Sequence, residues 1–184
     1  MLGLSRRRTS ARWRGDPYPW GPWVAVAVVA GLAIGRPFFA KAPPTPEFLE
    51  ETTYEVRYVV DGDTLQLANG ARVRLMGVDT PETVKPNHPV EPFGPEATAF
   101  TKDFVRSGAV RLQLDHERRD RYGRFLAFVW VDDRMLNEEL VREGLARFEP
   151  NFAYSSSVKT RYRHAQAEAQ SQGRGIWSLA RSKP

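Results

Sequence analysis

Residues 59–83 read "VVDGDTLQLANGARVRLMGVDTPET", and this stretch decides the fold. Apolar and polar residues alternate before it and within it, as they do in half-buried β-strands. The alternating runs are residues 53–60, 64–67 and 71–78. Asn69 and Gly70 separate the last two runs and are residues that tight hairpin turns favour. The pattern therefore predicts three consecutive antiparallel strands.

The remaining elements follow from the same reading. A proline-rich loop comes after residue 83, and Pro95 then opens a helix that ends before Gly108. Further strands are predicted over residues 109–117 and 124–133, and further helices over 136–143 and 155–172. The last helix carries one apolar stripe, formed by Val158, Tyr162, Ala165 and Ala169. Five strands with a helix after the third predict an α+β, mainly β fold, an OB-type five-stranded barrel with three helices.

The N-terminal part has the organisation of a targeting segment. A basic head precedes an apolar stretch, residues 23–34, that is shorter than the roughly 18–20 residues of a comfortable membrane span. We expect an uncleaved signal anchor; the alternative is a signal peptide cleaved near Ala42, where "AKA" offers small residues. The positive-inside rule then places the domain outside the cytoplasm, on the periplasmic or cell-surface side. The predicted organisation is a targeting segment over 1–40, a proline-rich linker over 41–52, the domain over 53–178 and a tail over 179–184.

The charge of the chain is concentrated in that N-terminal part. The chain carries a formal charge of +5, yet residues 1–41 hold seven Arg or Lys side chains against one Asp. Residues 42–184 hold 20 basic and 21 acidic side chains, so the basicity of the chain does not indicate a polyanionic partner of the domain. There is no cysteine, and the three histidines lie far apart, which excludes a catalytic thiol and the usual zinc motifs.

Three carboxylates lie near the ends of the predicted strands. The hairpin is expected to bring Asp63 and Asp79 together, with Asp61 close by. Oxygen ligands without His or Cys select calcium or magnesium, whereas the alternative is that these residues simply form turns and caps. Arg74 in the middle of a strand and Glu82 after a proline favour a site. A buried arginine requires a partner, so Arg74 either pairs with the carboxylates or binds an anionic ligand.

A second charged stretch, "HERRDRYGRFLAF", covers residues 116–128. Arginines interleaved with Tyr122 are suited to contact phosphates and to stack on a base. The alternative is a solvated loop, which we expect for Arg118 and Arg119. Arg124 is a stronger candidate because it stands at the entry to an apolar strand.

These motifs together resemble the thermonuclease family, the staphylococcal nuclease homologues. The resemblance rests on "VDGDTLQL", "RVRLMGVDTPET", "FGPEATAFTKDFV", "DRYGRFLAFVWVDDRMLNEELVREGLA" and "GIWS", and it runs from about residue 53 to residue 178. It implies an OB barrel with three helices. It also implies calcium-dependent, nuclease-type hydrolysis of DNA and RNA that leaves 3′-phosphates.

The resemblance also implies a metal site. Asp63 and Asp79 match the carboxylate ligands of Ca²⁺, and the backbone carbonyl of Thr80 matches a third ligand. Asp61 matches a residue just outside the direct ligands.

The catalytic residues implied by the resemblance are Glu82, as the general base that activates water, and Arg74 and Arg124, which hold the phosphate. Guanidinium groups suit this role because their forked donors contact phosphoryl oxygens in pairs.

The predicted substrate contacts are Arg121, Tyr122 and Tyr154. Arg121 and Tyr122 match one side of the nucleotide pocket of the family. The chain departs from the family on the other side, where "RFEPNFAYSSS" stands in place of a tyrosine-rich stretch and Tyr154 is the candidate.

The first hypothesis is therefore an exported or membrane-anchored, calcium-dependent nuclease, expected to be a monomer with DNA and RNA as substrates. An alternative is a catalytically silent OB module that binds nucleic acid or protein; such a module would lack an acidic ligand or an arginine, and none is missing here. A third is a membrane-tethered interaction domain in which Arg74 and the aspartates only support the fold. That hypothesis predicts that Arg74→Ala unfolds the domain, whereas a catalytic role predicts a folded, inactive one.

Overall fold

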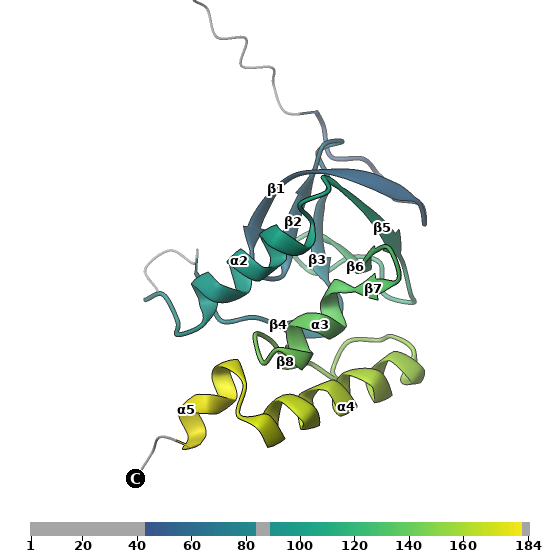
Figure 1. The fold of residues 1–184 in the computed structure, drawn as a ribbon. Coiled ribbons are helices and arrows are strands. Elements are labelled where there is room, and N and C mark those ends of the chain that lie inside the picture. Colours follow the sequence, from purple (N-terminus) through teal and green to yellow (C-terminus); the bar gives the residue numbers. More distant parts are fainter. Residues whose placement is uncertain (1–42, 84–88, 182–184) are drawn as a thin grey trace, which may run out of the picture. The chain divides into compact units, whose positions relative to one another are not determined.

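The computed structural model describes residues 43–83 and 89–181 (Figure 1). In these residues a barrel closes around the core, with strand order β3-β2-β1-β5-β6 and a final pairing of β3 with β6. The β3–β6 pair is parallel, and the other neighbours are antiparallel. The barrel strands are β1 (Thr53–Asp61), β2 (Thr64–Leu67), β3 (Arg72–Leu75), β5 (Ala109–Gln113) and β6 (Phe125–Val131). The predicted five-stranded OB-type barrel is thus confirmed.

The predicted hairpin joins β2 to β3. Thr64 lies opposite Arg74 in the antiparallel register. Between the strands, Gly70 adopts a φ of 87°, a conformation that glycine reaches without a steric penalty. The side-chain oxygen of Asn69 accepts a hydrogen bond from the amide of Ala71 at 3.1 Å, so the turn residues close the hairpin as the sequence indicates.

The predicted strand over residues 71–78 is interrupted. β3 ends at Leu75, and Gly77 turns the chain with a φ of 74°. The chain then forms a two-residue strand, β4 (Val78–Asp79), which pairs antiparallel with β8 (Arg147–Phe148) instead of continuing the barrel. A Cβ atom on Gly77 would lie 2.4 Å from the hydroxyl of Tyr154, so this close approach requires glycine. The break carries Asp79 out of the barrel wall.

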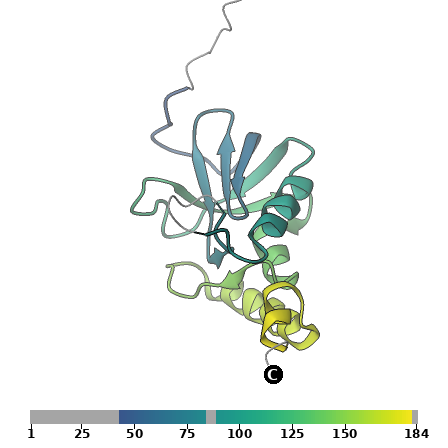
Figure 2. The ribbon, with the colours of Figure 1, turned by 90° about the vertical axis from the view of Figure 1, so that its left-hand side faces the viewer.

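The three predicted helices are present and cover the barrel on one side and at one end (Figures 1 and 2). They are α2 (Gly94–Phe104), α3 (Leu136–Arg142) and α4 (Ser156–Gln172). The stripe of α4 is buried as predicted, at Val158, Tyr162, Ala165 and Ala169. Glycines end α3 and α4: Gly144 and Gly173 have φ values of 67° and 63°. Short elements that the sequence did not predict are β7 (Arg134–Met135), η1 (Gly175–Trp177) and α5 (Ser178–Arg181).

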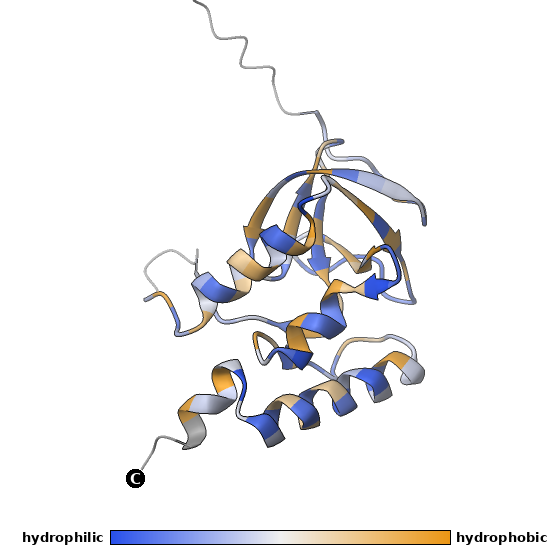
Figure 3. Ribbon diagram, in the orientation of Figure 1, coloured by the Kyte–Doolittle hydropathy of each residue, from blue (hydrophilic) through white to orange (hydrophobic). Residues whose placement is uncertain are grey.

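The core fills the barrel and continues beneath it to α3 and α4 (Figure 3). Asn137 of α3 is fully buried and connects these two parts. Its side-chain oxygen accepts from the amide of Val129 at 2.9 Å, and its amide group donates to the carbonyls of Met76 (3.1 Å) and Ala127 (3.2 Å). The bond to Met76 fixes the chain just before it leaves the barrel towards Asp79.

Part of the predicted linker packs on the domain. Leu49 is 5% exposed and belongs to the core. Arg119, which we expected to be solvated, donates to the carbonyls of Pro46 (3.0 Å) and Glu47 (2.6 Å), and its guanidinium lies 3.7 Å from the ring centroid of Phe125. The prediction for Arg119 was therefore wrong.

The predicted targeting segment, residues 1–40, lies outside the described residues. Among the helices of the described part, none combines the length and apolar character required to cross a bilayer.

Candidate active site

A cavity of about 170 Å³ opens where the ends of β1, β2 and β4 approach β3 and the loop after β4. It gathers every residue to which the sequence assigned a catalytic or metal-binding role. Its lining consists of Asp61, Asp63, Arg74, Asp79, Thr80, Pro81, Glu82 and Arg124. Residues from five separate positions in the chain thus meet at one place, although their individual roles stay predictions.

Arg74 is the buried centre of this cluster, with 9% of the residue exposed. Its guanidinium lies 2.8 Å from a carboxylate oxygen of Asp63 and 3.0 Å from one of Asp79. It also donates to the carbonyl oxygens of Leu75 (3.2 Å) and Val78 (2.7 Å). Arg74 therefore holds the carboxylates and also the backbone turn that carries the chain from β3 to β4.

The two aspartates around Arg74 differ in their surroundings. Asp63 is 5% exposed, and one of its oxygens accepts from both the amide and the hydroxyl of Thr80, each at 3.0 Å. Its other oxygen accepts from the hydroxyl of Thr64 at 3.0 Å. The Asp79 side chain, in contrast, is 63% exposed. One carboxylate is thus fixed by the fold, and the other faces the open side of the cavity.

Two carboxyl groups of the cavity have raised pKa values. Burial, reinforced by the charge of Asp63, raises the pKa of Asp61 to about 6. Burial also raises the pKa of Asp79, although Arg74 acts in the opposite direction. Among the described residues, no group of three or more His, Cys, Asp or Glu side chains is arranged as a metal site. The guanidinium of Arg74 instead lies between Asp63 and Asp79 and contacts both.

Glu82 is held at its backbone by Glu91. The amide of Glu82 donates to a carboxylate oxygen of Glu91 at 3.2 Å, and the amide of Glu91 donates to the carbonyl of Glu82 at 2.9 Å. One carboxylate oxygen of Glu82 accepts from the amide of Thr83 at 3.0 Å. The sequence analysis did not identify Glu91, because nothing in its local pattern marks a carboxylate that binds a backbone amide nine residues away.

Asp120 is a second residue that the sequence analysis missed, and it orients Arg124. Its carboxylate accepts from Nε of Arg124 at 2.6 Å and from the amides of Tyr122 (2.9 Å) and Arg124 (3.0 Å). The aspartate thereby closes the loop, because it binds amides that follow it in the chain. The residues "DRYGR" indicate such a turn, since an aspartate is followed by a glycine within the loop. Because Asp120 binds Nε, the terminal nitrogens of Arg124 can contact a ligand in the cavity that this residue lines.

A hollow of about 530 Å³, which we call the Tyr122 hollow, adjoins the cavity and shares Glu82 and Arg124 with it. Arg72 and Tyr122 also line it. Tyr122 is 68% exposed, and its hydroxyl accepts a hydrogen bond from Arg121 at 2.8 Å. The structure therefore brings two of the three predicted substrate contacts next to the cavity.

Tyr154, the third predicted contact, lies elsewhere. It is 6% exposed, its ring packs against Phe128 at a centroid distance of 5.9 Å, and its hydroxyl donates to the carbonyl of Glu149 at 3.1 Å. Burial raises its pKa well above the usual range. Its position in the core, over Gly77, does not support the predicted contact with substrate.

Known proteins share this sequence organisation. A family model described as "Staphylococcal nuclease homologue" matches residues 72–179. The thermonuclease of Staphylococcus hyicus is 47% identical over 134 residues, which cover 70% of this chain and 77% of that protein. For the thermonuclease of Staphylococcus intermedius the identity is 47% over 131 residues, or 68% and 76% of the two chains. Endonuclease YncB of Bacillus subtilis (strain 168) is 44% identical over 127 residues, or 65% and 58%. The chain therefore belongs to the family of staphylococcal nuclease homologues.

Proposed function

We propose that this chain is a calcium-dependent nuclease that hydrolyses phosphodiester bonds of DNA and RNA and leaves 3′-phosphates. Its place among the staphylococcal nuclease homologues, next to thermonucleases and an endonuclease, supports nuclease activity. The observation that carries the proposal is the 170 Å³ cavity, in which two guanidinium groups meet four carboxylates. Such a set can bind a phosphodiester, activate water and hold a cation in one place.

In the proposed reaction, water attacks the phosphorus atom, the new P–O bond forms, and the bond to the 5′ oxygen breaks. Glu82 accepts the proton of the attacking water, since its carboxylate lines the cavity and its backbone is fixed by Glu91. Arg74 and Arg124 stabilise the negative charge that develops on the phosphoryl oxygens. The 5′ oxygen leaves as a hydroxyl group after it takes up a proton.

Calcium would be held by the carboxylates of Asp63 and Asp79 and by the backbone carbonyl of Thr80. The donor chemistry fits a hard cation, because these ligands are all oxygen atoms and carboxylates outnumber guanidiniums in the cavity. When bound, the ion would neutralise charge on the phosphoryl oxygens.

The substrate preference follows from the Tyr122 hollow. Tyr122 offers an exposed aromatic ring, and the guanidinium of Arg121 lies 4.8 Å from its centroid. A base stacks on such a ring whatever its sequence, and a guanidinium holds the neighbouring phosphate. These contacts suit single strands of either DNA or RNA.

We place the protein outside the cytoplasm, anchored by its N-terminal segment or secreted after cleavage near Ala42, and as a monomer. The basic head and apolar stretch of residues 1–40 support this localisation. Protease added to spheroplasts, whose outer layers are removed, should degrade an anchored domain. A domain that is protected until the spheroplasts are lysed would contradict the proposal.

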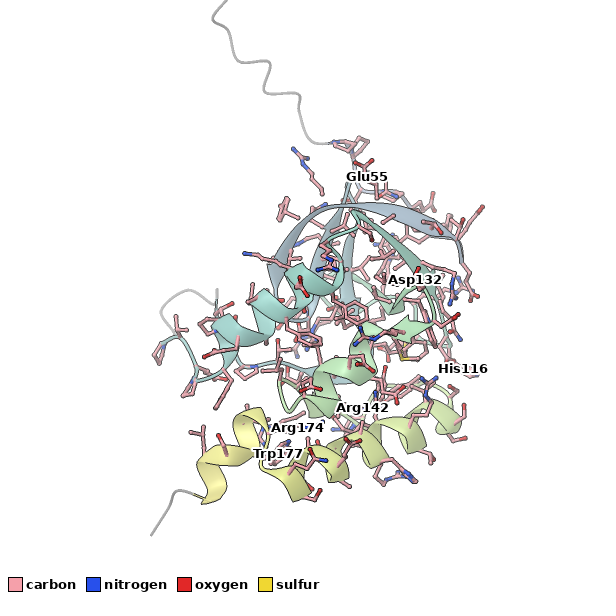
Figure 4. All side chains as sticks on the ribbon, in the orientation of Figure 1. Glu55, His116, Asp132, Arg142, Arg174 and Trp177 are labelled. Carbon is pink, nitrogen blue, oxygen red and sulfur yellow. The ribbon has the colours of Figure 1, made fainter. Side chains whose placement is uncertain are left out.

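The decisive experiment measures cleavage of labelled single-stranded DNA by the full chain in mild detergent, with Ca²⁺ or with a chelator. We expect cleavage with Ca²⁺ only, and a loss of about 10²–10⁴-fold in Glu82→Gln. Glu55→Gln is the matched control, because Glu55 is exposed on β1 at the end of the barrel away from α4 (Figure 4). Ca²⁺ should also raise Tm, since an ion that binds only the folded chain stabilises it.

Two results would contradict the proposal. Cleavage at the full rate in chelator would contradict the proposed calcium dependence. A folded chain that binds DNA but never cuts it would favour the silent OB module instead.

A further inference from the structure

A third hollow, of about 510 Å³, adjoins the cavity on the side of Asp79, Thr80 and Pro81, which line both. We call it the Trp177 hollow. The Tyr122 hollow shares Glu82 and Arg124 with the cavity instead. The cavity therefore adjoins two larger hollows, and each shares different residues with it.

Arg147 and Trp177 form the distinctive wall of the Trp177 hollow. The guanidinium carbon of Arg147 lies 4.9 Å from the centroid of the indole. Arg147 is also the register partner of Asp79 in the β4–β8 pair, and directly opposed residues of an antiparallel pair project to the same face. The arginine is thus presented on the face that carries a predicted metal ligand.

Trp177 is held in place by the end of α3. The amide of Ile176 donates to the carbonyl of Gly144 at 2.9 Å, and Arg174 donates to the carbonyl of Arg142 at 3.1 Å. Figure 4 shows Arg142, Arg174 and Trp177 along this contact between α3 and the C-terminal elements. The aromatic wall is therefore fixed before any ligand binds, which lowers the entropic cost of binding.

Arg147 is available to an anion. It is exposed, and no ion pair between it and a carboxylate is found in the described residues, whereas Arg74 and Arg124 both have one. Leu179, 50% exposed, adds apolar surface to the same hollow. Because Asp79 and Glu91 also line the hollow, a phosphate there requires the positive charge of Arg147.

We propose that the Trp177 hollow binds the nucleotide on the far side of the scissile bond from the one at Tyr122. The phosphate of this nucleotide contacts Arg147, and its base stacks on the Arg147–Trp177 pair. The inference rests on the proposed nuclease function and adds a second subsite to it. A strand that is cut internally has nucleotides on both sides of the cavity, and the two hollows offer one place for each.

The experiment uses the full chain and single-stranded DNA with one ordinary phosphodiester. The substrates of the series carry one to three additional nucleotides either on the 5′ side or on the 3′ side of this bond. The additional nucleotides are joined by phosphorothioate linkages, which keep the negative charge of a phosphodiester. In the wild type, kcat/KM should rise with extension in both directions. In Arg147→Ala, the increase in kcat/KM on extension in one direction should be about tenfold smaller than in the wild type. In Tyr122→Ala, the increase on extension in the other direction should be lost.

Arg111→Ala is the matched control, because Arg111 is likewise exposed and lies over a tryptophan, 5.1 Å from the ring centroid of Trp130, but on β5. It should keep both gains. Arg147→Met keeps an apolar side chain over Trp177 but removes the charge. It should lose the increase in kcat/KM that depends on the phosphate contact of Arg147, while its Tm should equal that of the wild type.

Three results for Arg147→Ala would overturn the subsite. Its kcat/KM could increase on extension in both directions as in the wild type, it could lose the increase in the same direction as Tyr122→Ala, or it could be lowered equally at every substrate length. A wild type that cleaves no member of the series would instead overturn the nuclease proposal itself, and the subsite with it.

Discussion

In two regions of this molecule arginines pair with carboxylates, one of which is buried in each region, and they do so in different ways. Between α3 and α4 the ion pairs are balanced: Arg134, Arg142, Arg161 and Arg174 pair with Glu138, Glu139, Glu143 and Glu168. In the cavity, four carboxylates face two arginines, and one of these, Arg124, is already paired with Asp120. The helix network therefore balances its own charges, whereas the cavity, where we propose the active site, keeps an excess of carboxylates.

The pKa shifts follow this difference. In the network between the helices, burial opposes the charge of Arg142, but hydrogen bonds and charge from Glu138 outweigh it and raise the pKa of this arginine. In the cavity, burial and Asp63 raise the pKa of Asp61 to about 6, which disfavours its ionised form. The network is balanced in charge, whereas the cavity keeps an excess of carboxylates, which the proposed calcium ion would offset.

The sharpest test of the comparison is Arg124→Ala. We expect kcat to fall about 10²–10³-fold, as when one preorganised donor to a developing charge is removed. The free energy of unfolding should fall by about 1–2 kcal/mol, because Asp120, with 10% of its side chain exposed, loses its arginine but keeps two amide donors. Oligonucleotide cleavage with Ca²⁺ and urea unfolding measure the two effects. Arg118→Ala, on the same loop but outside the cavity, is the control. A wild-type rate in Arg124→Ala would place this arginine with the structural ion pairs.

Arg142→Ala should give the opposite result. Glu138 is 7% exposed and would lose one of its two arginine partners, so the free energy of unfolding should fall by about 2–4 kcal/mol. The cleavage rate should not change at temperatures where the variant is folded. Arg134→Ala, which removes a pair whose arginine is 62% exposed, should cost less than about 1 kcal/mol. If Arg142→Ala loses cleavage activity while its urea midpoint is unchanged, the helix network has more than the structural role assigned to it here.

Glu91→Ala tests whether the cavity depends on its backbone support. Without the acceptor for its amide, Glu82 is less precisely positioned, and we expect kcat to fall about tenfold with little change in KM. Glu91→Gln retains an oxygen acceptor and should stay within about threefold of the wild type. If both variants lose the same activity, the charge of Glu91 matters rather than its hydrogen bond.

The smallest effect is expected at Asp115, which accepts from the amides of Ser155, before α4, at 3.0 Å and of His116 at 2.8 Å. Burial alone would raise its pKa, but these hydrogen bonds, together with the contact to the imidazole of His116, outweigh burial and lower the pKa below the usual 3.8. The ionised form therefore stabilises the native state above pH 3.8, and this stabilisation is lost as the pH falls through the lowered pKa. Asp115→Ala should cost about 1 kcal/mol at pH 6 and progressively less below pH 4, in urea unfolding with chelator.

Asp115→Asn keeps a neutral acceptor, so its difference from the wild type should also appear at pH 6 and fade in acid. A gap that stays constant between pH 6 and pH 3 would contradict the assignment of the shift to these hydrogen bonds.

The sequence predicted those features that depend on local pattern. The hairpin at Asn69 and Gly70 and the stripe of α4 follow from periodicity and turn chemistry over a few residues. The β4–β8 pair could not be predicted in this way, because two-residue strands have no period and their pairing depends on distant segments. Tyr154 was misjudged for the same reason: its burial depends on the space above Gly77, which only the folded chain reveals.

Arg74 shows a related limit. The sequence offered a choice between a structural and a catalytic role, tested by whether Arg74→Ala unfolds. The structure shows why this test cannot separate them: the same guanidinium that lines the cavity also holds the carbonyls of Leu75 and Val78. Loss of these bonds would leave buried acceptors unsatisfied, which destabilises the fold whatever the catalytic role.

The short β4 strand has a consequence for the biosynthesis of the protein. Asp79 lies opposite Arg147, and the amide of Glu149 donates to the carbonyl of Gly77 at 2.9 Å. The backbone at Asp79, whose side chain contacts Arg74, is therefore also supported from late in the chain. A nascent chain that has emerged from the ribosome only as far as β6 has its barrel strands but not this support. The backbone support of the cavity is therefore complete only near the end of synthesis. For the proposed nuclease, this timing would protect the nucleic acids of the producing cell from a partly made chain.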